Sequence, residues 1–119
     1  MTQSLLAICS YPPSSRTHAR EALDAILATA LFGQELKLFF CGDGVYQLLQ
    51  NQGDFTGDGK PLSDSLAALP LYDVNAIFVD QQSLEERGLD SAVLLPGAEI
   101  IGPEQAGELL VGCARIMSF

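Results

Sequence analysis

Three short runs of apolar residues constrain the fold of this chain more than any other feature. They cover residues 5–9, 36–41 and 76–79, and they are nearly uninterrupted by polar side chains. A strand with one solvent-facing side alternates between apolar and polar residues, whereas a continuous apolar run is typical of a strand buried on both faces. We therefore expect these runs to form the inner strands of a sheet that is covered on both sides.

Helical patterns separate the apolar runs. From residue 18 to residue 32, apolar side chains recur at spacings of three and four, which predicts an amphipathic helix. Shorter helices are expected over residues 45–49 and 64–69. Another should begin at Ser83, because Ser83 and Glu86 have the spacing of a capping box. Each apolar run is thus followed by a helix.

The last part of the chain continues this alternation. Residues 98–101 are expected to form a short fourth strand, and residues 114–117 a last one. Pro103 suits the first turn of a helix over residues 104–112. Strands that alternate with helices predict an α/β fold, a three-layer α/β/α sandwich with a mostly parallel sheet of about five strands. We expect residues 1–119 to form a single domain.

Composition and charge exclude several classes of protein. Hydrophobic residues make up 48% of the 119 residues and charged residues 18%, which is not the composition of a disordered chain. Six basic residues stand against fifteen acidic ones, and the net charge of −9 disfavours direct binding to nucleic acid, which requires cations. No apolar run approaches the ~20 residues of a membrane-spanning helix. Since the N-terminus also lacks the basic segment of a secretory signal, we expect a soluble cytoplasmic protein.

The cysteines and the single histidine do not predict a metal site. Cys9, Cys41 and Cys113 are too few for a disulfide framework, and their odd number suits a reducing compartment. They and His18 lack the paired spacing of metal ligands. We expect neither a metal nor another cofactor. Cys9 should be packed inside the core, and Cys113 half-buried between a helix and a strand.

The predicted strands end in residues that can carry chemistry. In open parallel sheets, functional groups gather beyond the carboxyl ends of the strands. Cys41 has the best position for a reactive thiol, because the start of a helix favours a thiolate, although the carboxylate of Asp43 opposes one. Cys41 is therefore the candidate catalytic residue. Asp43, Gln81 and Gln82 are further candidates at the same edge.

Two glycine-rich segments do not complete a nucleotide-binding or calcium-binding motif. Residues 42–44 would need a glycine at Gln47 to match the dinucleotide fingerprint, and a tight turn is the expected role. Residues 53–61 fail as a P-loop, since Pro61 stands where the motif requires serine or threonine. They also fail as an EF-hand, since Ser65 stands where glutamate is required. A surface loop is expected there.

Several longer segments resemble a known family. They are "REALDAILATALFGQELKLFFCGDGVYQLL" at residues 20–49, "SLEERGLD" at 83–90 and "RIMSF" at 115–119. They are similar to the DsrE/DsrF-like family, with most likeness to its TusC (DsrF) branch. The resemblance implies a DsrEFH-like α/β/α subunit of a hetero-oligomer, a hexamer of three kinds of related small chain. Such complexes pass persulfide sulfur between proteins, either toward 2-thiouridine at the tRNA wobble position or in sulfur oxidation.

The resemblance also indicates where a relative holds its sulfur. In the family's catalytic subunit, the sulfur-carrying cysteine follows the third strand and precedes an arginine–glycine pair. Alignment on residues 87–88 places Asp80 at that position. A carboxylate cannot carry sulfur, and its charge disfavours a nearby thiolate. We therefore expect a non-catalytic, scaffolding and partner-binding subunit of a sulfur-relay complex, with 2-thiouridine formation as the expected branch and Cys41 as a structural residue.

Other interpretations stay open at this point. Cys41 could itself carry sulfur, which would make the chain a working sulfurtransferase subunit. The complex could belong to the sulfur-oxidation branch. The chain could also be a stand-alone, flavodoxin-like binder of a small ligand, with Asp43 and Asp80 lining a crevice at the carboxyl edge of the sheet.

Overall fold

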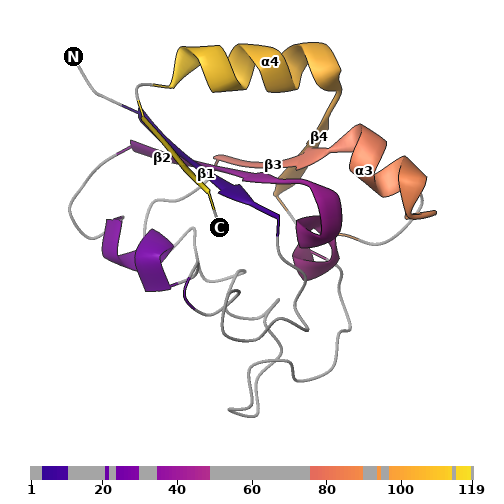
Figure 1. The fold of residues 1–119 in the computed structure, drawn as a ribbon, viewed down its shortest axis with the longest axis horizontal. Helices are drawn as coiled ribbons and strands as arrows, with labels where there is room; N and C mark the ends of the chain where they lie inside the picture. Colours follow the sequence, from indigo (N-terminus) through magenta and orange to yellow (C-terminus); the bar gives the residue numbers. More distant parts are fainter. Residues whose placement is uncertain are drawn as a thin grey trace.

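The computed structural model describes residues 4–10, 21, 24–29, 35–48, 76–89, 94, 97–113 and 115–118. The described strands form one five-stranded parallel sheet in the order β4-β3-β2-β1-β5 (Figure 1). Their bounds are Ser4–Cys9 for β1, Glu35–Phe40 for β2, Ala76–Asp80 for β3, Ala98–Ile101 for β4 and Arg115–Ser118 for β5. The described helices are η1 (Gly42–Leu48, a 3₁₀ helix), α3 (Gln81–Glu86) and α4 (Pro103–Gly112).

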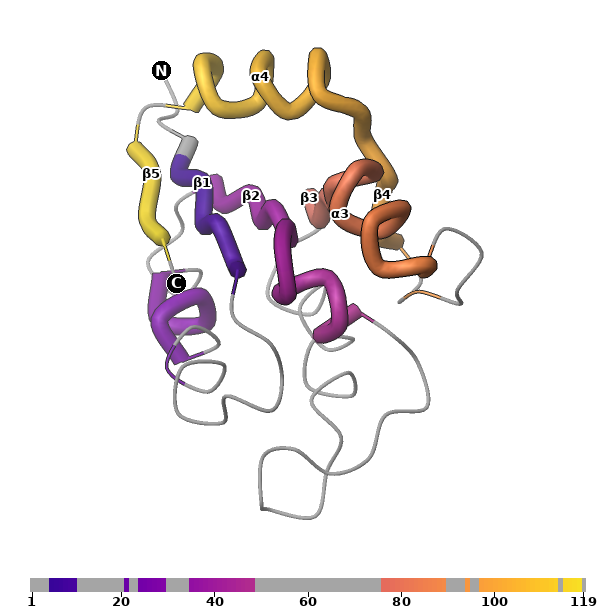
Figure 2. Tube along the Cα trace, turned by 45° about the vertical axis from the view of Figure 1, so that its right-hand side comes forward, coloured from indigo at the N-terminus to yellow at the C-terminus, as the bar shows by residue number. Residues whose placement is uncertain are grey.

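Helices cover both faces of the sheet. Helix α4 lies over one face, and η1 and the helical residues 24–29 lie on the other (Figures 1 and 2). Figure 2 also shows the strands side by side from β5 to β4, with α3 at the β3 and β4 side. The predicted α/β fold with a sheet of about five strands is confirmed, and every pair of neighbouring strands is parallel.

The inner strands are buried on both faces, which explains their continuous apolar sequences. In β1, Leu5, Ala7 and Cys9 point into the larger core, together with side chains of β2, η1 and Ile26. Leu6 points to the opposite face and is fully buried in the smaller core. Because successive side chains of a strand alternate between faces, a run without polar residues is needed when both faces are covered.

The smaller core lies between the sheet and α4. Ala106, Leu109 and Cys113 recur at spacings of three and four and pack against the buried residues Leu6, Phe39 and Ile101. Proline occupies the first turn of α4, as predicted. The helix covers this face only in part, since none of its own residues is buried.

Most predicted elements agree with the structure to within two or three residues. Residue 41 lies just after β2 instead of at its end, and the helix expected over residues 45–49 is the 3₁₀ helix η1, which begins at Gly42. The described parts of the helix predicted over residues 18–32, namely Glu21 and residues 24–29, are helical. His18, the loop over residues 53–61 and the helix over 64–69 lie outside the described residues. Within the described ranges, no helix has the length and hydropathy needed to cross a membrane.

Candidate functional site at the carboxyl edge of the sheet

The chain segments that follow β2 and β3 lie next to each other at the carboxyl edge of the sheet. The two strands pair in parallel, with Phe40 opposite Val79, so both strands end at the same level of the sheet. The first segment carries Cys41 and Asp43, and the second is helix α3, which follows directly on Asp80, the last residue of β3. Residues that are almost forty positions apart in the sequence thereby share one small region.

The turn after β2 approaches β1 closely. The backbone amide of Cys41 donates a hydrogen bond to the carbonyl oxygen of Cys9 at 3.1 Å. Gly42 then adopts a φ of 55°, in the left-handed region that glycine enters without steric cost. At Gly44 a β-carbon would lie 2.0 Å from the same carbonyl oxygen of Cys9, so only glycine fits. The two glycines hold the turn against the end of β1.

Asp80 joins this turn to helix α3 through Ser83. Its Oδ2 atom accepts hydrogen bonds from the backbone amide of Ser83 at 3.1 Å and from the Ser83 hydroxyl at 2.6 Å. The hydroxyl oxygen of Ser83, a buried residue, in turn accepts a hydrogen bond from the amide of Gly42 at 2.9 Å. We call this chain of hydrogen bonds the Asp80 network. It connects the chain segments after β2 and β3 through a single buried hydroxyl.

The structure corrects the predicted start of α3. Ser83 was expected to cap this helix with Glu86 completing a capping box, and that prediction is wrong. The helix begins at Gln81, and Asp80 is the N-cap residue, in extended conformation. Aspartate is a strong N-cap because its carboxylate accepts a hydrogen bond from a free backbone amide of the first helical turn. The spacing from Asp80 to Ser83 is itself a capping pattern, so the sequence contained the signal.

Arg87 forms a second connection between the segments that follow β2 and β3. Its Nε and Nη2 atoms both lie 3.1 Å from Oδ1 of Asp43, and its Nη1 donates to the carbonyl oxygen of Ser83 at 3.1 Å. Because the Asp43 side chain is 57% exposed, we expect the ion pair to contribute only about 0–1 kcal/mol. This contact could not be predicted from the sequence alone, since Arg87 is 44 residues from Asp43.

Burial and a neighbouring carboxylate disfavour the thiolate form of Cys41. Partial burial raises the pKa of the Cys41 thiol, the negative charge of Asp80 raises it further, and Arg87 lowers it in part. The net shift of the pKa is upward, and so it works against the thiolate that the start of a helix would favour. Burial and the neighbouring Cys41 raise the pKa of Cys9 to about 12. Both shifts disfavour the thiolate, which is the reactive form of a cysteine.

The remaining candidate residues lie around this site. Gln81 and Gln82 are exposed at the start of α3, and the amide oxygen of Gln81 lies over Gly102, 3.5 Å from where a β-carbon would be. Cys113 is half-buried at the end of α4, as expected. Among the described residues, histidine, cysteine and carboxylate side chains do not gather in groups of three that could hold a metal ion.

The sequence matches other proteins over nearly its whole length. Residues 3–119 match the model of the DsrE/DsrF-like family. A TusC homolog from Aliivibrio fischeri is 37% identical over 107 residues, which cover 90% of this chain and 91% of that protein. A TusC homolog from Pseudomonas aeruginosa is 37% identical, with 92% of both chains covered. Protein TusC from Escherichia fergusonii is 41% identical over 70% of each chain.

A solved structure matches the fold. The crystal structure of the ychN protein from E. coli superposes with a TM-score of 0.85, covering 99% of this chain and all of that one. The sequence identity is 19%, so this likeness supports the architecture and nothing more specific.

Proposed function

Because this chain belongs to the DsrE/DsrF-like family, we propose that it is a non-catalytic, partner-binding subunit of a sulfur-relay complex. Partner proteins would carry the persulfide, and this chain would hold them in place. Its similarity to TusC proteins over most of its length supports a subunit of that type.

The single observation that carries the non-catalytic part of the proposal is the role of Asp80. At the position where the family resemblance places a sulfur-carrying cysteine, this chain has a carboxylate that caps α3 and binds Ser83. The same charge raises the pKa of the nearby Cys41 thiol. A persulfide is anionic near neutral pH, so a fixed negative charge beside it would be unfavourable. The site is thus organised for structural support and against sulfur chemistry.

Exposed apolar side chains support the partner-binding part. Val111 on α4 is 87% exposed, and Leu110 beside it is 36% exposed. Both outer strands also carry an exposed isoleucine, Ile100 in β4 at 47% and Ile116 in β5 at 48%. Scattered apolar residues are common on protein surfaces, but the adjacent Leu110 and Val111 on α4 suit an interface between subunits, and the isoleucines on the two opposite edges of the sheet suit further ones.

We place the complex in the cytoplasm, as a hetero-hexamer of related small subunits that serves 2-thiouridine formation at the tRNA wobble position. The similarity to TusC proteins favours this branch over sulfur oxidation. With a net charge of −9, the chain is unsuited to direct contact with tRNA, so its partners would be proteins.

Co-expression with two related small subunits from the same genome tests the proposal. We expect the three chains to elute together from a size-exclusion column. Val111→Glu should weaken that association by at least about tenfold, because binding would desolvate the new charge. The free energy of unfolding of the isolated variant should stay within about 0.5 kcal/mol of the wild-type value, since Val111 is exposed.

Ala28→Glu is the matched control for that variant. It introduces the same charge at an exposed helical position on the opposite face of the sheet, and it should leave the co-elution unchanged. A wild-type chain that remains monomeric in the presence of its related subunits would contradict the proposed function.

A second candidate function is sulfur transport on Cys41. The observations that favour it are the half-buried position of Cys41 at the carboxyl edge and the presence of Arg87, which lowers the pKa of its thiol. The opposing effects of burial and Asp80 are larger. This candidate is therefore the weaker one, and sulfur loading of the chain distinguishes the two.

A further inference from the structure

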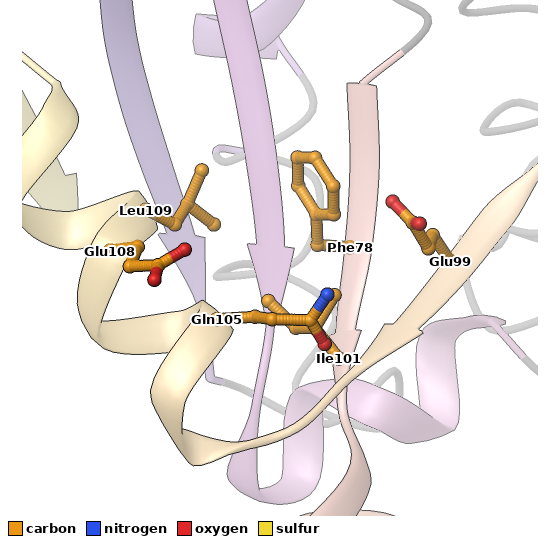
Figure 3. A pocket seen from close by; sticks show the side chains of 6 residues that line it. All are labelled: Phe78, Glu99, Ile101, Gln105, Glu108 and Leu109. Atoms are coloured by element: carbon orange, nitrogen blue, oxygen red, sulfur yellow. The ribbon is translucent and has the colours of Figure 1, made fainter.

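A hollow lies between α4 and the outer part of the sheet, and the cysteines are not among the residues that line it. It has a volume of about 240 Å³. The residues that line it come from β3, β4 and α4 and are shown in Figure 3: Phe78, Glu99, Ile101, Gln105, Glu108 and Leu109. It begins beside Ile101, which pairs with Asp80 in the sheet, and so it adjoins the candidate site without including it.

The lining combines an apolar floor with two carboxylates. The ring of Phe78 stands in the middle of the hollow, with Glu99 on the strand side and Glu108 on the helix side (Figure 3). Both glutamates are exposed. Among the described cations, Arg87 is paired with Asp43, and neither Lys37 nor Arg115 forms an ion pair with these carboxylates. Within the part of the chain that the structure describes, the hollow therefore presents two carboxylates without an ion-pair partner around an aromatic face.

We propose that this hollow binds an arginine side chain from a partner protein. A guanidinium group can place its flat face against the Phe78 ring, where the ring quadrupole attracts a cation. Its N–H donors lie in one plane and point outward, so they can reach carboxylates on two sides of the ring. A lysine ammonium is a point charge without that geometry and would suit this arrangement less well.

The shape and charge of the chain favour a protein partner over a free small molecule. Pockets for small ligands usually bury about 70–90% of the ligand surface. This hollow is open, because Glu99, Gln105 and Glu108 are all exposed. A bound side chain would therefore stay in contact with water unless the molecule that carries it also covers the hollow. A partner surface does so, and the net charge of −9 attracts a basic one. The inference uses neither Cys41 nor Asp80, and it goes beyond the proposed function by naming the chemistry that a partner must present.

Titration of the full-length chain with short peptides, followed by amide chemical shifts, tests this inference. The probes are capped Gly-Arg-Gly and its lysine and citrulline counterparts, citrulline being a neutral analogue with the shape of arginine. The arginine peptide should shift amides of α4 and of β3 and β4 around the hollow. The Glu99→Gln/Glu108→Gln variant should bind it about tenfold more weakly, or roughly threefold for each exposed charge pair.

Glu35→Gln/Glu85→Gln is the matched control, since both residues are exposed, lie outside the hollow and change the net charge equally. This variant should bind the arginine peptide like the wild type. The inference is overturned if the citrulline or lysine peptide binds as well as the arginine peptide, if the shifts lie elsewhere, or if millimolar arginine peptide produces none. These outcomes are independent of co-elution with related subunits, so they do not bear on the proposed function.

Discussion

Gly44→Ala should leave the chain unable to reach its native fold. A β-carbon at this position would lie 2.0 Å from the carbonyl oxygen and 2.7 Å from the carbonyl carbon of Cys9. Both atoms belong to the backbone of an inner strand, so neither can move aside without breaking the pairing of β1 with β2. We expect the free energy of unfolding to fall by more than about 4 kcal/mol, which is a large part of the stability of a protein of this size.

Gly107→Ala is the matched control for this substitution. Gly107 lies in the middle of α4, and among the described residues a β-carbon there would meet no heavy atom within 4 Å beyond the adjacent backbone of its own helix. Alanine should therefore stabilise the helix by up to about 1 kcal/mol. Urea denaturation followed by circular dichroism measures both changes. A Gly44→Ala chain that unfolds within about 1 kcal/mol of the wild type would show that the turn does not approach β1 as described.

The second large effect is expected from the Asp80 network. Ser83→Ala removes the hydroxyl that accepts from the amide of Gly42 and donates to Asp80. Because Ser83 is buried, the Gly42 amide loses its partner in a poorly hydrated place, at a cost of about 1–3 kcal/mol. Asp80→Ala removes both the helix cap and the acceptor of the hydroxyl, and should cost about 1–2 kcal/mol.

A double-mutant cycle shows whether the two residues act together. If they belong to one network, the combined variant should lose less stability than the sum of the single ones, with a coupling of at least about 0.5 kcal/mol. Gln82→Ala, at an exposed position between them, should change stability by less than about 0.5 kcal/mol. Strict additivity of the two losses would mean that the hydrogen bonds through Ser83 contribute nothing as a unit.

The inner strands were well predicted from the sequence, because a strand buried on both faces has a continuous run of apolar residues. The runs over residues 5–9, 36–41 and 76–79 correspond to β1, β2 and β3 with differences of one residue at their ends. Pro103 marked the start of α4 equally well, since proline is suited to a first helical turn. Both features depend on residues that are close together in the sequence, so a single sequence is enough to predict them.

The site was less predictable because its contacts depend on which strands are neighbours. Two capping patterns overlap in the sequence, from Asp80 to Ser83 and from Ser83 to Glu86, and local propensity does not choose between them. In the structure Asp80 is the cap, and the Ser83 hydroxyl accepts a hydrogen bond from the backbone amide of Gly42. Gly42 reaches Ser83 only because β2 and β3 are adjacent. The pairing of Arg87 with Asp43 depends on the same adjacency.

The most direct test of the account is whether this chain accepts sulfur. The purified chain is incubated at neutral pH with a cysteine desulfurase and cysteine, and its intact mass is then measured with and without a reductant. We expect no increase by the mass of a sulfur atom at Cys41, because partial burial and the charge of Asp80 raise the pKa of its thiol and so disfavour the reactive thiolate. A reductant-sensitive sulfur atom that is absent from Cys41→Ser and is passed on to an acceptor protein would contradict a non-catalytic role.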